Sequence, residues 1–317
     1  MGSLLTAVYQ SAVVLAFSPL IHGILEKAKA RVESRRGISP LQPYYDLIKW
    51  FRKENVVPEG ARLRYLTLPV FAFTIYSMIP MVVPVVVAVP SAVAPTVDFL
   101  GGAFLFGLAS YLSIVTVERV GTYYTGIGAT RSVTFAAFAE PVLITVFFAV
   151  ALISMSNNPF LTNHVLRKSP YWLVSPTHVL VTAGFFMLLL FETGKLPTES
   201  HGLSEFGMIE QGKGLEYSGP VLAVATWGSW VKSATLMSVF LNVFAVPWGC
   251  PTSDDVVSLL EGTVVWFGKI LALIGAFLVV EEALAKVRLF KIIDYLSVSF
   301  LLTVLGVIAY LVTGGSW

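Results

Sequence analysis

The chain has 317 residues, of which 56% are hydrophobic and only 13% are charged, and its mean hydropathy is +0.78. A soluble domain of this size carries about 25% charged residues, so the composition excludes an ordinary water-soluble protein and favours a membrane protein. The net charge of +2 says little by itself. The single cysteine, Cys250, excludes a disulfide framework and any cysteine-ligated iron–sulfur cluster or four-cysteine zinc site within the chain.

Eight apolar stretches are long enough to cross a bilayer, which takes about 20 residues. None alternates in the way of an outer-membrane barrel strand, and the first lacks the features of a cleaved signal peptide. We therefore expect an all-α integral membrane protein with about eight transmembrane helices in a single polytopic domain, 1–317. The spans are expected near 3–25, 63–89, 97–118, 133–155, 174–192, 217–247, 261–281 and 293–313.

The basic residues are distributed very unequally between the two sides of this topology. The loop between the first two spans holds ten of the 21 Lys and Arg residues, and the other loops on that side hold seven more. The opposite side holds two, Arg167 and Lys168, and two further lysines lie inside spans. Because cytoplasmic loops are rich in Lys and Arg, we expect these basic loops in the cytoplasm of a cell-membrane protein, with both termini outside.

The first inner loop contains a short amphipathic segment. Tyr44, Leu47, Ile48 and Phe51 share one helical face, the other face carries Asp46, Lys49 and Lys53, and Pro43 suits the first helical position. This pattern predicts a short interfacial helix anchored by Trp50 and the tyrosines. The alternative is a solvated connector whose periodicity is accidental.

Several carboxylates lie within or at the ends of the spans, where a charge is costly and usually faces the interior of the bundle or a water-filled route. Glu140 is expected about eight residues into its span, or ~12 Å deep. We predict an acid-lined half-channel that opens to the cytoplasm and exchanges protons, because neighbouring carboxylates resist full ionisation. Its candidate acids are Glu118, Glu140, Glu192, Glu199, Glu205, Glu210, Glu216, Glu281 and Glu282. The acids at span ends could instead be simple interfacial caps.

Lys232 and Lys269 are expected in the opposite, outer half of the membrane. They are candidates for ion transfer, and they could equally snorkel or form structural pairs. The four histidines do not form a pair at matched depth, so a bis-histidine haem is not expected. No phosphate-binding glycine motif and no Ser/His/Asp arrangement stands out. The basic first loop could bind lipid headgroups or a protein.

Three stretches of the inner loops carry recognisable motifs. The first is Arg35-Arg36-Gly37 with Pro40-Leu41-Gln42-Pro43 and Lys53-Glu54; the second is Gly128-Ala129-Thr130-Arg131 with Glu140-Pro141. The third runs from Glu192 through Pro197, Glu199 and Glu205 to Glu216-Tyr217-Ser218-Gly219. Together these motifs resemble the H-type subunit of respiratory complex I and of energy-converting hydrogenases, and Asp294 after Arg288 and Lys291 loosely matches that family's entry to the last span. The resemblance covers nearly the whole chain.

The departures from the family pattern favour its hydrogenase branch. Quinone-reducing members carry a longer stretch before the Leu-Gln-Pro segment, which is shortened here to residues 35–40. The sequence of residues 42–54 resembles that of formate hydrogenlyase and ferredoxin-dependent archaeal hydrogenase subunits more closely than that of quinone-reducing members. The subunits of sulfur-reducing sister complexes are a near alternative. This places quinone binding in doubt.

The resemblance implies an energy-coupling membrane anchor within an oxidoreductase complex, with no catalytic centre, cofactor or metal in this chain. Iron–sulfur clusters and a nickel–iron site are expected in peripheral partner subunits, and antiporter-like membrane subunits are expected alongside. Arg35, Arg36, Asp46, Lys49 and Arg131 are the candidates for docking the peripheral arm. No nucleic-acid partner is expected. A quinone-reducing subunit and a stand-alone ion carrier remain as alternatives.

Overall fold

The computed structural model describes residues 4–57, 62–89, 98–118, 123–168, 170–194, 212, 214–283 and 291–313. At residues 62–64, 117, 118, 124 and 170 it describes the backbone alone. Within these ranges every regular element is helical, which confirms the predicted all-α class. The elements are α1 (Leu4–Val32), α2 (Gln42–Phe51), α3 (Arg62–Met78), η1 (Ile79–Met81), α4 (Phe99–Glu118), α5 (Tyr123–Ser154), α6 (Pro159–Lys168), η3 (Pro170–Val174), α7 (Pro176–Glu192), α9 (Gly219–Val239), η4 (Phe240–Ala245), α10 (Val256–Ala283) and α11 (Lys291–Val312).

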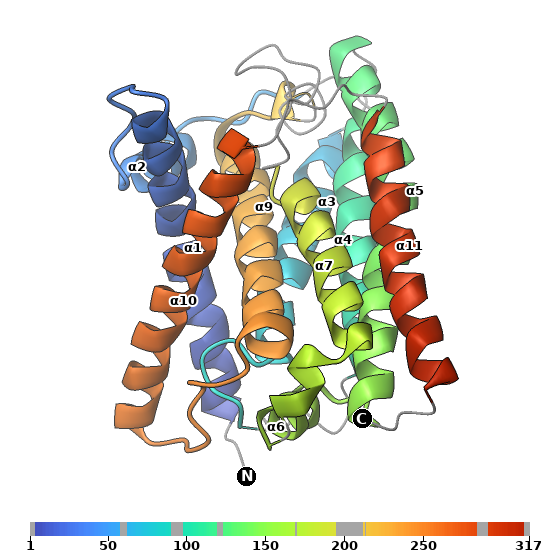
Figure 1. Cartoon of the computed structure of the whole chain (residues 1–317). Helices are drawn as coiled ribbons and strands as arrows, with labels where there is room; N and C mark the ends of the chain where they lie inside the picture. Colours follow the sequence, from blue (N-terminus) through green and yellow to red (C-terminus); the bar gives the residue numbers. More distant parts are fainter. Residues whose placement is uncertain are drawn as a thin grey trace.

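Eight long helices stand roughly side by side, one for each predicted span (Figure 1). Five of them, α1, α4, α5, α10 and α11, are long and apolar enough to cross a membrane by length and composition, and α3 and α7 are shorter apolar helices. The chain is therefore a multi-pass membrane protein. In Figure 1, α1 begins and α11 ends at the end of the bundle where α6 lies, opposite α2.

Three boundaries differ from those expected. The predicted span 63–89 is helical only as far as Met81, because Pro80 and Pro84 interrupt the backbone hydrogen bonding. The predicted inner loop 119–132 is instead helical from Tyr123 onward, since α5 begins there. The predicted span 217–247 ends in a π-helix, η4, instead of a regular α-helix.

Residues 83–89 are buried although they are not helical. Non-helical backbone at membrane depth is tolerated only where its polar groups find partners inside the protein. Gln10 of α1 supplies one such partner, because its Oε1 accepts hydrogen bonds from the backbone amides of Val85, Val86 and Val87 at 3.0, 3.1 and 3.3 Å. Asn242 of η4 supplies another, because its Nδ2 donates to the carbonyls of Pro84 and Val85 at 3.1 and 2.6 Å.

The predicted interfacial helix is confirmed as α2, with proline in its first turn. Leu47 is buried, whereas Ile48 and Phe51 of the same apolar face are about half exposed, at 49% and 45%. The loop before α2 folds back along α1, where the carbonyl of Pro40 lies 2.1 Å from the position of a β-carbon on Gly23. Only glycine permits this approach, so Gly23 fixes the path of the loop that leads into α2.

The start of α9 is tied to the segment that follows α2. The hydroxyl of Ser218 accepts a hydrogen bond from the amide of Val56 at 2.7 Å and donates to its carbonyl at 3.1 Å. The Tyr65 hydroxyl of α3 donates to the carbonyl of Glu216 at 2.9 Å and accepts from the amide of Ser218 at 2.9 Å. The interfacial helix is thus connected through hydrogen bonds to the helix that carries Lys232.

Candidate charge-coupling site

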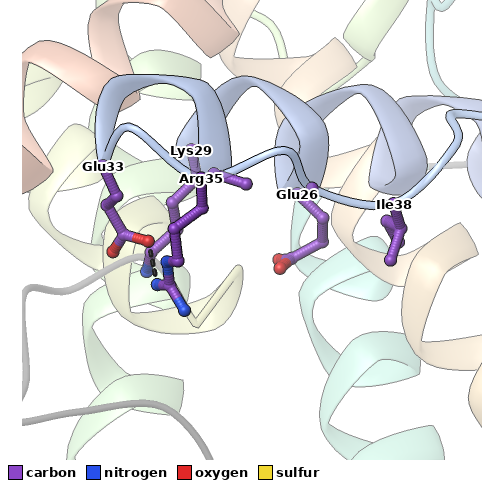
Figure 2. Close-up of a pocket in the computed structure, with 7 residues that line it drawn as sticks. Glu26, Lys29, Glu33, Arg35 and Ile38 are labelled. Atoms are coloured by element: carbon purple, nitrogen blue, oxygen red, sulfur yellow. Dashed lines mark hydrogen bonds and ion pairs between the residues drawn. The ribbon is translucent and has the colours of Figure 1, made fainter.

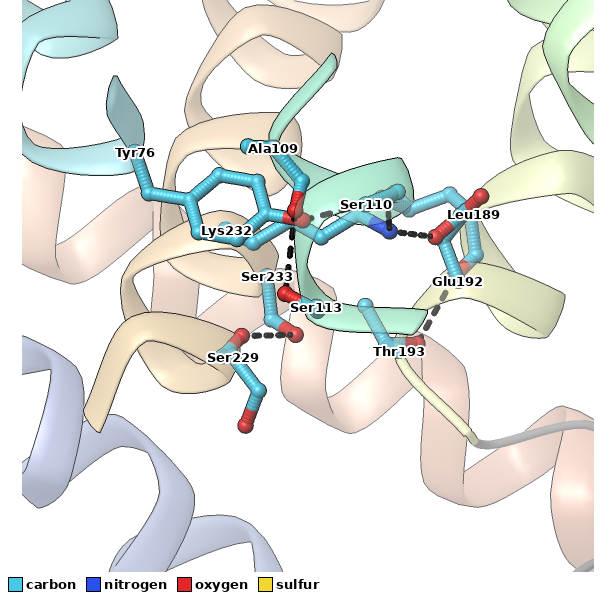
Figure 3. Close-up of polar contacts among 10 residues, drawn as sticks. All are labelled: Tyr76, Ala109, Ser110, Ser113, Leu189, Glu192, Thr193, Ser229, Lys232 and Ser233. Atoms are coloured by element: carbon cyan, nitrogen blue, oxygen red, sulfur yellow. Dashed lines mark hydrogen bonds and ion pairs between the residues drawn. The ribbon is translucent and has the colours of Figure 1, made fainter. Parts of the chain in front are cut away.

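A partly buried ion pair lies between α7 and α9. Lys232 Nζ is 2.6 Å from Glu192 Oε2, and each side chain is only 18% exposed (Figure 3). Lys232 lies near the middle of α9, whereas Glu192 is the last residue of α7. A charged pair at this depth is costly to desolvate and is tolerated because each charge neutralises the other.

The ion pair is extended by two hydroxyl groups. Lys232 Nζ donates a hydrogen bond to Ser110 Oγ of α4 at 3.1 Å, and Ser110 Oγ lies 3.1 Å from the hydroxyl oxygen of Tyr76 of α3. Figure 3 shows these side chains in one row between the helices. The row gives the ammonium group of Lys232 a neutral partner in addition to the carboxylate.

Glu140 of α5 lies against α4 beside the same place. A β-carbon on Gly107 would lie 3.4 Å from both Cδ and Oε1 of Glu140, so the carboxylate packs against the α4 backbone where it has no side chain. Gly107 and Ser110 are three residues apart and therefore share a face of α4. Glu140 also interacts electrostatically with Lys232 and Glu192. The three charges thus form one cluster, to which α3, α4, α5, α7 and α9 all contribute.

Two expected positions are corrected. Lys232 was expected in the outer half, away from the acids, but it pairs with Glu192 because its long side chain reaches from mid-helix toward the end of α7. Glu140 was expected eight residues into its span. Because α5 already begins at Tyr123 and ends at Ser154, Glu140 lies close to the middle of the helix.

The remaining predicted acids are spread over the structure or lie outside it. Glu216 precedes α9 and is half-buried, with its carbonyl bound by Tyr65. Glu281 pairs with Lys29 of α1, and Glu282 beside it is exposed on α10. The structure does not bring these acids into the central cluster. Only the backbone of Glu118 is described, and Glu199, Glu205 and Glu210 lie outside the described residues.

Lys269 lies apart from this cluster, near the end of the bundle where α6 lies. Its Nζ donates to Asn242 Oδ1 and to the carbonyl of Val246, both at 2.9 Å, and lies 3.9 Å from Cys250 Sγ. Whether this end faces the outside, as expected for Lys269, stays a prediction. Its role in ion transfer stays a prediction.

The docking candidates lie at the end of the bundle that carries α2, together with a cavity of about 310 Å³. The cavity lies between α1 and the loop that follows it, and Figure 2 shows acidic and basic side chains around it. Arg35 and Arg36 are exposed, and Arg35 pairs with Glu33. The cavity is lined by Glu26, Lys29, Ala30, Glu33, Arg35, Gly37 and Ile38.

The other docking candidates lie on helices. On α2, Lys49 is exposed, and Asp46 Oδ1 accepts a hydrogen bond from Gln42 Nε2 at 3.1 Å. Arg131 is part of α5 and not of a loop. In the described part of the chain, no group of three or more His, Cys, Asp or Glu residues is arranged to hold a metal ion.

Three contributors to the cluster were missed in the sequence. Ser110, Tyr76 and Gly107 lie in apolar spans where serine, tyrosine and glycine are common and carry no distinguishing pattern. The signal that could have indicated two of them is the spacing of Gly107 and Ser110, which places a gap and a hydroxyl on one helical face. That spacing becomes informative only once Glu140 and Lys232 are known to flank α4.

The fold and the cluster define a class of protein: a polytopic membrane protein with titratable groups in the interior of its bundle. A family model described as NADH dehydrogenase matches residues 5–313. The chain therefore belongs to the NADH dehydrogenase family, and the family resemblance inferred from the inner-loop motifs is confirmed.

Two curated relatives come from Escherichia coli (strain K12). Hydrogenase-4 component C is 28% identical, covering 89% of this chain and 88% of the relative. Formate hydrogenlyase subunit 4 is also 28% identical, covering 90% of this chain and 92% of the relative. Among solved structures, a chain of the membrane-bound sulfane sulfur reductase, an archaeal respiratory membrane complex, matches with a TM-score of 0.77. That match is 18% identical and covers 96% of this chain and 98% of the other, so it supports the fold.

Proposed function

We propose that this chain is the membrane-anchor and energy-coupling subunit of a ferredoxin-dependent, hydrogenase-type complex related to respiratory complex I. It links electron transfer in a peripheral arm to translocation of protons or sodium ions. The observation that carries the proposal is the Glu192–Lys232 pair, with Glu140 beside it, at the meeting point of several helices of the bundle. The names of the two bacterial relatives support the hydrogenase type of complex.

The cluster is suited to coupling because its charges are mutually dependent. Lys232 interacts with both carboxylates, so a change in the charge of one carboxylate alters the protonation of the other, since charges interact strongly in a low-dielectric interior. The hydrogen bonds from Asn55 and Val56 to the start of α9 connect the segment after the interfacial helix to the helix that carries Lys232. A change in the peripheral arm can reach the cluster by this route.

In this proposal the chain itself carries no catalytic centre. Peripheral hydrogenase-like and iron–sulfur subunits hold the clusters and a nickel–iron site, and antiporter-like membrane subunits lie alongside. Purification in mild detergent, followed by identification of the co-purifying subunits and metals, tests this assignment. We expect iron and nickel with hydrogenase-like subunits. Bound quinone would select a quinone-reducing complex, and iron without nickel in a sulfur-reducing preparation would select the sulfur-reducing alternative.

We propose that the end carrying α2 faces the cytoplasm and that both termini lie outside, because the basic loops gather at that end. Ser39 and Thr252 are exposed residues in loops at opposite ends of the bundle. In a Cys250→Ser background, we expect Thr252→Cys to react with a membrane-impermeant thiol reagent added to intact cells and Ser39→Cys to be protected. Reaction of Ser39→Cys in place of Thr252→Cys would reverse the orientation.

Reversal of Arg35 and Arg36 to Glu is expected to release the peripheral arm while the membrane part still assembles. Both side chains are exposed beside the mixed-charge cavity, and charge complementarity at a docking surface is lost when the sign of its charges is reversed. The measurement is the ratio of peripheral to membrane subunits after affinity purification. Lys49→Glu on α2 provides a single-charge comparison. An unchanged ratio in the double variant would show that these arginines face lipid headgroups.

A further inference from the structure

A polar stripe runs along α9 from the central cluster toward the end of the bundle where α6 lies. It consists of Lys232, Thr235, Ser238 and Asn242, whose spacing of three and four residues keeps them on neighbouring parts of one helical side. Thr235, Ser238 and Asn242 are completely buried. At 1.5 Å per residue the stripe covers about 15 Å, which is half the apolar thickness of a bilayer.

Asn242 connects the stripe to Lys269 of α10. Lys269 Nζ donates to Asn242 Oδ1 and to the Val246 carbonyl at 2.9 Å, and its third neighbour is the Cys250 thiol at 3.9 Å. Burial raises the pKa of Cys250, so the thiol is neutral at physiological pH. Arg167 Nη1, the other nearby cation, donates to the Cys250 carbonyl at 2.8 Å. In the described part of the chain, no partner of Lys269 carries a negative charge.

Polar atoms without a protein partner surround the same place. Asn163 Nδ2 donates to the Asn242 carbonyl at 2.6 Å, and His178 Nε2 lies 2.8 Å from the Phe244 carbonyl oxygen. Both of these carbonyl groups belong to η4. Asn163 Oδ1, His178 Nδ1 and Gln10 Nε2, in contrast, are buried and have no hydrogen-bond partner among the described residues. Buried polar atoms of this kind are normally satisfied by ordered water. The π-helix η4 lies beside them, and π-helical turns are frequent at functional sites.

We propose that the α9 stripe, Lys269 and the polar side chains around η4 form a hydrated exit route for protons, in which Lys269 is the proton carrier. The proposal deepens the proposed function and rests on it. The neutral amine of Lys269 takes a proton from the water chain on the side of Ser238 and Asn242, forming an N–H bond as an O–H bond breaks. The resulting ammonium then releases a proton to water on the side of Val246 and Cys250, where an N–H bond breaks as an O–H bond forms, and the neutral amine is restored.

Trp266 of α10 has a positioning role in this route. Its Nε1 donates to Ser238 Oγ at 2.8 Å, and Ser238 Oγ in turn donates to the Ala234 carbonyl at 2.6 Å. The side chain of Trp266 is itself buried. It therefore holds the hydroxyl in the middle of the stripe.

Cysteine accessibility tests the hydration of the route independently of any activity. In the complex with Cys250→Ser, we compare Ser238→Cys on the stripe with Met237→Cys, which is equally buried but faces away from it. A small cationic methanethiosulfonate reagent is added to the face that carries the termini. We expect Ser238→Cys to react about tenfold faster, because only a thiol in contact with water forms the reactive thiolate. Equal rates would overturn the proposal, and the Cys250→Ser protein without an added cysteine gives the background rate.

The role of Lys269 is tested by the number of protons taken up per electron transferred in liposomes that contain the whole complex. Lys269→Met and Lys269→Arg should each lower this ratio by about tenfold or more, because an arginine keeps the charge but does not release its proton. A normal ratio in Lys269→Arg would show that Lys269 is a fixed charge and would contradict the proposal. Uptake of sodium ions without protons by the unmodified complex would also contradict the proposal. Absence of uptake of both ions by the unmodified complex would instead refute the proposed function, and the labelling result would still stand.

Discussion

Replacement of Lys232 by Met is expected to abolish ion uptake coupled to electron transfer and to destabilise the assembled complex by about 3 kcal/mol. The stability loss arises because Glu192, which is only 18% exposed, would keep a charge without its counter-ion. The loss of coupling arises because Lys232 is the cation that both Glu192 and Glu140 interact with. Thermal denaturation of the complex and the ion-to-electron ratio in liposomes measure the two effects.

A double variant separates stability from coupling. In Glu192→Gln/Lys232→Met no buried charge is left without a partner, so the complex should regain most of its stability while ion uptake remains absent. The Lys29–Glu281 pair, which joins the last turn of α1 to α10 outside the central cluster, provides the matched control. Lys29→Met/Glu281→Gln should leave the ion-to-electron ratio unchanged. Normal coupling in the Lys232→Met complex would show that the central pair is purely structural.

Glu140→Gln is expected to lower the ion-to-electron ratio by about tenfold or more while the complex assembles with its metals. Glutamine keeps the shape of the side chain against Gly107 and one hydrogen-bonding edge, but it cannot carry a proton. The preceding residues of α5, from Phe135 to Ala139, carry no charge that could replace it. Ion uptake in liposomes and electron transfer in detergent are measured on the same preparation.

The matched control for Glu140 is Glu282→Gln on α10. Glu282 is exposed and lies outside the central cluster, so its loss should have little effect on the ratio. A normal ratio in Glu140→Gln would make this carboxylate structural. An equal loss in Glu282→Gln would show that the ratio responds to acids in general and not to the cluster.

Hydropathy and helical periodicity were sufficient to predict the eight long helices and the interfacial helix α2. Both features depend on local composition, which decides how a segment partitions between water and lipid. The non-helical segment 82–89 could not be predicted in this way. Its valines are as apolar as the preceding helix, so hydropathy does not mark where the helix ends. Its stability depends on Gln10 and Asn242, which are distant in sequence and become its partners only in the folded bundle.

The candidate acids could be chosen from the sequence, but their partners could not. Glu140 was a candidate because of its depth in a span and Glu192 because it ends a span, whereas the pairing of Glu192 with Lys232 depends on how α7 and α9 pack and on the reach of the lysine side chain. The same holds for Lys269, whose contacts with Asn242 and Val246 exist because α9 ends in a π-helix. Side-chain reach and helix packing are properties of the bundle and not of any one segment.

The measurement that tests the central claim most directly compares ion movement by the complete complex with ion movement by this chain alone, each purified and reconstituted in liposomes. We predict that the complete complex moves ions only while electrons are transferred, since the chain acts by coupling its charge cluster to a peripheral arm. The chain alone should move none under an imposed ion gradient. Sustained ion transport by the isolated chain would contradict the account and would identify it as a stand-alone carrier.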